Sequence, residues 1–355
     1  MEQSYRTDSR RKAPAWLISL LLIALCLLLI GCDTRVQTIP TNSASSSVTQ
    51  TSCQGDDCGG ARGVKLFVEP DAGEKVILDA INSAKRSIWV KVYLLTNRNV
   101  IEALKSAAKH GKDVRVLLEE HPYGGGNLSP QESMSMLKSA GVQGKFTDPK
   151  FRFTHEKSMV IDGSVAYILT MNLTESALGE RNREYGIIDT NPADVQTVKG
   201  LFEADWQRTK ASLDNPRVVA SPINSRDTFV ALIRNAHETL QIEAETMNDE
   251  EIEQELMDAA KRGVNVQIVL PNSLSKGDLK DVSTLKRGKV KVRVIGSPYM
   301  HAKIIIADGQ KAFVGSVNIS TTSFDKNREL GIVIADQDVL KTLYQTFQKD
   351  WAKAS

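Results

Sequence analysis

Cysteine is almost missing from this chain, and its scarcity removes two kinds of chemistry. The 355 residues include four cysteines, all of them within the first 58 residues. A thiol nucleophile and a zinc ion held by thiolates both need cysteine, so neither is expected in the rest of the chain. Histidine is scarce too, with five residues. Any function that depends on imidazole must therefore use very few positions.

A surplus of positive charge is also missing. The chain holds 45 Lys and Arg against 43 Asp and Glu, and residues 1–31 contain four of the basic residues and two of the acidic ones. The chain after residue 31 is therefore electrically balanced. A general nucleic-acid-binding protein usually carries a basic excess. The balance argues against such a role, although a local basic groove can exist within a neutral total.

One long apolar run occurs, close to the N-terminus. Four basic residues precede an apolar stretch from about residue 13 to residue 30. A membrane span needs about 20 apolar residues, whereas a signal peptide has a shorter core. The run ends in Leu-Ile-Gly-Cys, which resembles the cleavage box of bacterial lipoproteins. Residues 1–31 are therefore predicted to be a lipoprotein signal peptide, and Cys32 is the predicted lipidation site.

This prediction places the mature chain outside the cytoplasm, lipid-anchored to the bacterial cell membrane. An uncleaved membrane anchor is the alternative and leads to the same location. Residues 32–62 are rich in Ser, Thr, Gln and Gly, so they bury little apolar surface and are predicted to form a flexible tether. Cys53 and Cys58 lie in this tether, where an oxidising compartment would allow a disulfide.

The most informative pattern is a residue frame that occurs twice. In each copy a His is followed by Lys two residues later and by Asp seven residues later. A hydroxyl residue and an Asn follow 15 and 17 residues after the His. Two of the five histidines carry this whole frame. An imidazole and an ammonium group supplied in duplicate suit chemistry at a phosphate. The copies are His155, Lys157, Asp162, Thr170 and Asn172, and His301, Lys303, Asp308, Ser316 and Asn318.

The secondary-structure pattern repeats as well. Alternating helix-like and strand-like segments occur at 73–86, 87–92, 99–110 and 113–118, and again at 226–236, 239–243, 249–262 and 265–270. Strand, helix and strand at this spacing predict βαβ units around a largely buried sheet. A Phe-x-x-x-Trp pair, typical of helix core packing, ends each series. We therefore predict two similar halves, residues 63–210 and 211–355, with the joint at 210–224.

Strand geometry assigns roles within each frame. Side chains two residues apart point to the same face of a strand, so the His and Lys of each copy are predicted to point the same way. Each His then has a fixed positive charge beside it. Asp162 and Asp308 lie past the strand end, at an odd spacing from the Lys. They are expected to fix a turn or orient neighbours rather than take part in the chemistry.

The polar residues that follow suit a bound phosphate. Hydroxyl and amide groups can hold the non-bridging oxygens of a phosphate, so these positions are predicted to be phosphate-binding. They are Thr170, Asn172, Ser316 and Asn318.

Two further carboxylates recur 29 and 28 residues after the motif histidines, each in an Asn-Arg-Glu context. A carboxylate bonded to one ring nitrogen fixes the tautomer and leaves the other nitrogen free to react. Glu184 and Glu329 are predicted to act in this way, with an ordinary surface Glu as the alternative. His110, His121 and His237 match nothing in the other half and are predicted to be structural or exposed.

These residues resemble the phospholipase D superfamily, whose signature is an HKD motif used twice. Here the motifs read HEKSMVID with LTMN, and HAKIIIAD with GSVN. The resemblance implies an α/β fold of two similar α/β/α sandwich halves with pseudo-twofold symmetry and one active site at their interface. It also implies that no metal or other cofactor is needed. The catalytic residues it implies are His155, Lys157, His301, Lys303, Glu184 and Glu329.

The resemblance also implies a mechanism. One His attacks phosphorus to give a phosphohistidine, and the other protonates the leaving alcohol. By analogy with two-copy members, His155 is assigned as the nucleophile and His301 as the general acid. The first copy departs from the family pattern, because Leu169 stands where the second copy has Gly315. The larger residue allows less backbone approach and makes symmetric phosphate contacts doubtful.

Several substrates fit this chemistry. A metal-independent phosphodiesterase that hydrolyses or transphosphatidylates phospholipids is the main expectation, because an enzyme anchored to a bilayer meets phospholipid at high local concentration. The alternatives are a cardiolipin-synthase-like phosphatidyl transferase, an extracytoplasmic metal-independent nuclease, and a tethered binding module without activity. One chain contains both motif copies, so a monomer is sufficient for a complete active site.

Overall fold

The computed structural model describes residues 59–124, 127–179 and 181–355. The predicted signal peptide, the predicted lipidation site Cys32, and Cys53 and Cys58 lie outside these residues. Lipid anchoring and a location outside the cytoplasm therefore stay predictions. None of the helices in the described part of the chain has the length and hydropathy of a membrane span.

Each half of the body builds one large β-sheet, and these two sheets share the same strand order. The first runs β1-β7-β6-β5-β2-β3-β4 and the second β8-β17-β15-β14-β9-β11-β12. In both, the last three strands are parallel and the other neighbours are antiparallel. This strand-for-strand repetition confirms the predicted pair of similar α/β halves.

The strands of the first sheet are β1 (Lys65–Glu69), β2 (Ser87–Val92), β3 (Asp113–Leu118), β4 (Gln143–Phe146), β5 (Ser158–Ile161), β6 (Val165–Leu169) and β7 (Asn182–Asp189). Those of the second are β8 (Val218–Ser221), β9 (Thr239–Ala244), β11 (Asn265–Pro271), β12 (Lys291–Ile295), β14 (Lys303–Ala307), β15 (Lys311–Gly315) and β17 (Glu329–Ile334). The described residues also form three two-residue strands: β10 (Met247–Asn248), β13 (Tyr299–Met300) and β16 (Ile319–Ser320).

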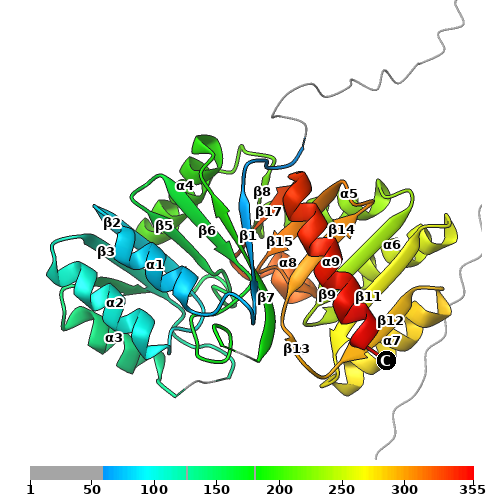
Figure 1. The fold of residues 1–355 in the computed structure, drawn as a ribbon, viewed down its shortest axis with the longest axis horizontal. Helices are drawn as coiled ribbons and strands as arrows, with labels where there is room; N and C mark the ends of the chain where they lie inside the picture. Colours follow the sequence, from blue (N-terminus) through cyan, green and yellow to red (C-terminus); the bar gives the residue numbers. More distant parts are fainter. Residues whose placement is uncertain (1–58, 125–126, 180) are drawn as a thin grey trace, which may run out of the picture. The chain divides into compact units, whose positions relative to one another are not determined.

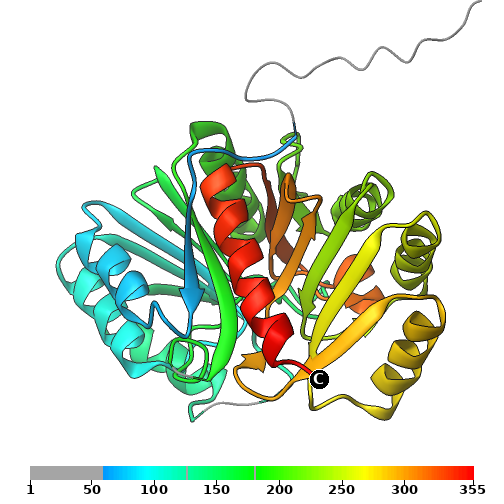
Figure 2. The same cartoon turned by 45° about the vertical axis from the view of Figure 1, so that its right-hand side comes forward.

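Helices cover both faces of each sheet (Figure 1). One outer layer holds α1 (Lys75–Ser83), α2 (Arg98–Lys109) and α3 (Pro130–Lys138), and the other holds α5 (Ser225–Arg234), α6 (Glu250–Lys261) and α7 (Lys276–Arg287). Between the sheets lie α4 (Pro192–Gln207) and α9 (Gln337–Lys353), the latter prominent in red in Figure 2. A short helix, α8 (Thr321–Asp325), follows β16.

The helix starts repeat between the halves because the capping residues repeat. Asn97 accepts a hydrogen bond from the backbone of Val100 at the start of α2, and Asp249 does the same for Ile252 at the start of α6. Such caps satisfy amide groups that have no partner inside the helix. Capping boxes begin α3 and α7 in the same way.

The central layer carries the predicted aromatic packing. Phe202 and Phe347 are buried, and each stacks on the Trp four residues later with ring centroids 5.8 Å apart. Both belong to one apolar core shared by α4, α9 and the facing sides of the two sheets. The prediction of core packing for these pairs is therefore confirmed, and their burial joins the halves.

The predicted joint at 210–224 contains a strand. Residues 218–221 form β8, which pairs antiparallel with β17 at the edge of the second sheet. Proline on both sides and a length of four residues make this strand look like a linker in the sequence. Its burial against the second half identifies it as part of the sheet.

Strand pairing also crosses between the halves. In the second half, β13 lies just before His301 and pairs in parallel with the start of β7 in the first half. In the first half, Thr154 forms a β-bridge with Arg328 of the second half. The chain segment that leads into each motif is therefore hydrogen-bonded to the opposite half.

Candidate active site

The two motifs occupy equivalent places, at the start of the central strand of each sheet. Lys157 directly precedes β5 and Lys303 opens β14, and each His stands two residues earlier. The expectation that each His–Lys pair lies within a strand is therefore wrong for both histidines and for Lys157. Their segment is bonded to the other half instead, as when the His155 amide donates to the Arg328 carbonyl at 2.8 Å.

Each motif Lys folds back on its own histidine. Lys157 Nζ donates to the His155 carbonyl at 2.5 Å, and Lys303 Nζ donates to the His301 carbonyl at 2.6 Å. Both lysine side chains are buried. The amino group of each motif Lys is therefore held beside its own His, as predicted.

The motif aspartates are structural. Asp162 accepts hydrogen bonds from the amides of residues 85, 86 and 87, and Asp308 from those of residues 237, 238 and 239. Both have positive φ, 54° and 52°, and a Gly follows each in the turn. Aspartate tolerates this left-handed conformation better than most residues. The carboxylate of each motif thus fastens its turn to the loop before β2 or β9, in agreement with the predicted turn-fixing role.

The histidine–glutamate pairs cross between the halves. His155 Nδ1 lies 3.1 Å from Glu329 Oε2, and His301 Nδ1 lies 2.7 Å from Glu184 Oε1. Both carboxylates are fully buried. The sequence predicted these four residues and their pairing with a motif His. The exchange between halves follows from the crossed strand pairing, and it makes the two motifs one site.

Burial alone would raise the pKa of these glutamates. The charge of the partner histidine and the hydrogen bond to it nevertheless hold the pKa of Glu184 and of Glu329 below its ordinary value. Each Glu is therefore ionised, and its His keeps a proton on Nδ1. The reactive nitrogen of each ring is then Nε2.

The hydroxyls predicted to bind phosphate face these glutamates. Thr170 Oγ1 donates to Glu184 at 2.6 Å, and Ser316 Oγ donates to Glu329 at 2.7 Å. Each hydroxyl also accepts a backbone amide, from Tyr185 and Leu330 respectively, and both side chains are fully buried. Their hydrogens are therefore already in use, and the geometry favours a positioning role over the predicted contact with phosphate.

The surroundings of Asn172 and Asn318 are compatible with their predicted role in phosphate binding. Asn172 accepts a hydrogen bond from the Leu94 amide at 3.1 Å, which leaves its amino group available, and it lines a cavity that also contains His301. Asn318 has a buried Oδ1 without a hydrogen-bond partner. Phosphate binding by these two residues stays a prediction.

Gly315 and Leu169 differ in how they pack against the neighbouring strand. A side chain added at Gly315 would place its Cβ 2.4 Å from the Gly331 Cα on β17. Leu169 faces Gly186 in the equivalent register of the first sheet and is buried in the outer core. The predicted effect on the symmetry of phosphate contacts stays a prediction.

Burial lowers the pKa of two groups in the first motif. The pKa of Lys157 falls to about 7, because burial outweighs the attraction of Glu329. The pKa of His155 is also lowered, mainly by burial, with the charges of Lys157 and Lys303 adding to the effect. A neutral imidazole at His155 is the form that can attack phosphorus.

Sequence reasoning missed one carboxylate of the site. Glu245 Oε2 lies 2.9 Å from Lys303 Nζ and 3.4 Å from His301 Nε2. It follows the last residue of β9, whereas the equivalent residue after β2 is Tyr93. The Tyr93 ring packs edge-on against His155, with centroids 4.8 Å apart. Glu245 and Tyr93 differ between the two repeats, so the search for residues that recur in both halves could not find them.

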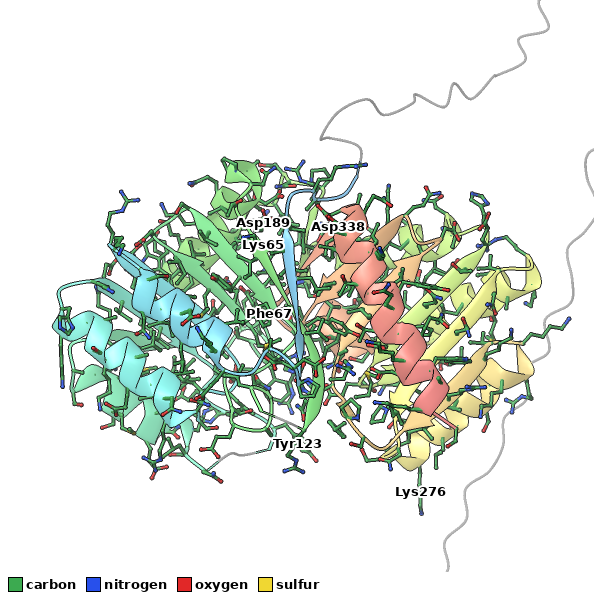
Figure 3. The ribbon with its side chains drawn as sticks, viewed as in Figure 1. Lys65, Phe67, Tyr123, Asp189, Lys276 and Asp338 are labelled. Carbon is green, nitrogen blue, oxygen red and sulfur yellow. The ribbon has the colours of Figure 1, made fainter. Side chains whose placement is uncertain are left out.

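One cavity is lined in part by a motif histidine, and a second lies next to the segment that precedes the first motif. The first, of about 980 Å³, is polar and is lined by His301, Asn172, Asn182, Arg181 and Tyr299 among others. The second, of about 920 Å³, is lined by Phe153, Tyr123 and several charged residues. Tyr123 is 87% exposed and projects from the body near the boundary of the two halves (Figure 3).

The three histidines outside the motifs lie at the surface. His110, His121 and His237 are exposed, as predicted. Within the described residues, no group of three or more His, Cys, Asp or Glu side chains is arranged to hold a metal ion.

Comparison with known proteins agrees with this geometry. A family model described as "Cardiolipin synthase, PLD-like domain" matches residues 77–206 and 229–351, once in each half and over most of the chain. The cardiolipin synthase of Oceanobacillus iheyensis is 25% identical over 340 residues, which cover 82% of this chain and 69% of the relative.

Two solved structures resemble the body. Phosphatidylserine synthase from Haemophilus influenzae has a TM-score of 0.59 and 14% identity, over 83% of this chain and 87% of its own. Polyphosphate kinase from Porphyromonas gingivalis has a TM-score of 0.63 and 16% identity, over 80% of this chain, which spans 46% of the kinase. At such identities the likeness concerns the fold alone. The matched family model and the paired motifs together show that the chain belongs to the cardiolipin synthase, PLD-like domain family and is an enzyme of the phospholipase D superfamily.

Proposed function

We propose that this chain is a phosphatidyl transferase that forms cardiolipin by joining a phosphatidyl group to the hydroxyl of phosphatidylglycerol. The observation that carries the proposal is the single site in which two His–Lys pairs meet and each His is bonded to a Glu of the other half. The similarity to a cardiolipin synthase supports transfer over the hydrolysis that the sequence favoured.

In the first step, His155 Nε2 attacks the phosphorus of a phosphatidyl donor. The bond from phosphorus to the head-group oxygen breaks, and His301 gives its proton to that oxygen. The products are a phosphatidyl group on His155 and a free head-group alcohol. Glu329 holds the His155 proton on Nδ1, so that Nε2 presents its lone pair to the substrate. Lys157 and Lys303 balance the phosphate charge.

In the second step, the hydroxyl of phosphatidylglycerol replaces the leaving alcohol. Its oxygen attacks phosphorus while its proton passes to His301, the bond to His155 breaks, and cardiolipin is released. With water in place of the hydroxyl, the same step would give phosphatidic acid. The choice between transfer and hydrolysis therefore depends on which acceptor occupies the cavity beside His301.

The test uses the full chain with vesicles of phosphatidylglycerol and a chelator, beside His155→Ala and a half-exposed control, Glu203→Gln on α4. Cardiolipin and released glycerol are measured by mass spectrometry. The proposal expects both products in equal amounts from the unmodified protein and the control, and neither from His155→Ala.

Other outcomes separate the alternatives. Phosphatidic acid without cardiolipin would support a hydrolase. Cleavage of plasmid DNA in chelator, with no change in the lipids, would support a nuclease. Either result overturns the transferase proposal while leaving the fold and the site geometry intact.

A further inference from the structure

The two histidines of the site have different surroundings. His301 has a carboxylate at each ring nitrogen, Glu184 at 2.7 Å from Nδ1 and Glu245 at 3.4 Å from Nε2. Among the described residues, His155 is paired with one carboxylate, Glu329, at Nδ1. The position equivalent to Glu245 holds Tyr93, whose ring lies against His155.

This difference bears on protonation. A neutral imidazole has one N–H and can donate to one carboxylate, whereas an imidazolium donates from both nitrogens. Glu184 also accepts from Thr170, and Glu245 from Lys303, but only a charged His301 ring presents an N–H to both carboxylates. The single carboxylate beside His155 is satisfied by the neutral ring, with its N–H on Nδ1.

We propose that Glu245 is a positioning residue that holds His301 as the imidazolium, so that His301 serves as the acid in the first step and His155 as the nucleophile. The inference rests on the proposed function, since it concerns the order of proton transfers at the same site. Glu245 acts through His301 and takes no part in bond formation to phosphorus.

The electrostatics of the pocket are consistent with this role. Burial would raise the pKa of Glu245, yet the charges of His301 and Lys303 hold it well below its ordinary value, so the carboxylate is ionised. The charged or titratable groups around His301 come from several elements. Glu184 lies on β7 and Glu245 follows β9. Lys303 lies on β14 with its Nζ 3.2 Å from His301 Nδ1, and Lys157 adds positive charge from the first half.

Glu245 is also positioned so that a substrate phosphate can displace it from Lys303. Its side chain is 28% exposed, unlike the buried Glu184 and Glu329. Once a phosphate oxygen takes its place on Lys303, His301 Nε2 is released toward the leaving-group oxygen with its proton in place. The first half has no matching carboxylate after β2, so the two halves are not interchangeable.

The test compares two donors that differ in their need for a proton. An alkyl leaving group such as glycerol requires general-acid catalysis, whereas p-nitrophenolate leaves without a proton. Single-turnover release of each leaving group is measured from phosphatidylglycerol and from phosphatidyl p-nitrophenol, because a single turnover isolates the first step. The proteins are the full unmodified chain, Glu245→Gln, Glu245→Asp and the control Glu203→Gln.

We expect Glu245→Gln to slow glycerol release by about 10- to 100-fold and to change p-nitrophenol release by less than about threefold. The alkaline limb of the pH profile for glycerol release should move to lower pH by about one unit, because His301 loses its proton more readily. Glu245→Asp keeps the charge and should recover part of the rate.

Equal loss with both donors and an unchanged pH profile would overturn the inference, since a structural role affects both reactions alike. Thermal melting of each variant checks that it is folded. If the unmodified protein released both leaving groups but formed no cardiolipin, the proposed transfer would be wrong. The rates of glycerol and p-nitrophenol release could still be compared between the variants. If the unmodified protein released neither leaving group, both the inference and the proposed function would be wrong.

Discussion

The two lysines of the site differ in what stabilises their charge. Lys303 has Glu245 at 2.9 Å, whereas Lys157 donates to a backbone carbonyl. Burial lowers the pKa of Lys157 to about 7. Below that pH the group is charged and attracts an anion, and above it the attraction is lost.

Anion binding to the free enzyme should therefore weaken as the pH rises through about 7. Sulfate, whose own charge is constant in this range, can serve as a competitive inhibitor that reports on the site. Its inhibition constant should rise by about tenfold between about pH 6 and pH 8 in the unmodified protein. In Lys157→Arg the guanidinium stays charged, so the rise should be smaller. Parallel curves for the two proteins would contradict the assignment.

The motif aspartates fix the turn that follows each motif strand. Asp308 gathers three backbone amides of the loop that leads into β9, and Asp162 does the same for β2. These contacts join two strands that are neighbours in the sheet but distant in sequence. They explain why the third letter of the motif recurs although it takes no part in the chemistry.

Replacing Asp308 by Ala should destabilise the protein more than it changes the site. The three amides lose a charged acceptor and are partly compensated by water, so we expect the free energy of unfolding to fall by about 1–3 kcal/mol. Urea denaturation measures the change, with the exposed Asp214→Ala as the control. A rate loss with unchanged stability would instead assign Asp308 to catalysis.

Burial of charge joins the two halves of the molecule. Arg183 binds Asp350 through two nitrogens at 2.5 and 3.0 Å, and Arg328 binds Asp205 at 2.9 Å, each pair crossing between the halves. Nearby, Tyr185 of the first half donates to Glu243 of the second at 2.6 Å. Removing one partner of such a buried pair leaves an uncompensated charge, so the interface tolerates few substitutions.

Glu243 should make stability depend on pH. Its pKa is raised to about 8 by burial and by the negative charge of Asp350. A raised pKa stabilises the folded state below the unfolded value near 4.5, and the contribution is lost as the pH rises through about 8. Glu243→Gln has no proton to lose. Its free energy of unfolding should therefore fall less than that of the unmodified protein between about pH 5 and pH 8.

Urea denaturation over this pH series measures the difference, and Glu203→Gln serves as the half-exposed control. Other buried acids with a raised pKa, among them Glu69 and Glu253, are present in all three proteins and cancel in the comparison. Identical pH slopes for Glu243→Gln and the unmodified protein would show that Glu243 is ionised in the folded state.

Local patterns were enough to predict much of this protein. Strands β2 and β3 have the predicted bounds because each is a short apolar run bounded by polar residues and turns. The duplication, the motif residues and the two glutamates are predictable for the same reason, since each half repeats them at a fixed spacing. Strand β8 was missed because its four residues carry too little periodicity to outweigh the flanking prolines.

By itself, the sequence determined that two similar α/β halves exist and which residue types each would contribute to a phosphate site. Tertiary structure alone decided that each His is paired with the Glu of the other half, that Thr170 and Ser316 face those glutamates, and that Glu245 stands beside His301 while Tyr93 stands beside His155. The physical reason is that residue spacing describes contacts within one repeat, whereas this site depends on strands and charges that cross between two.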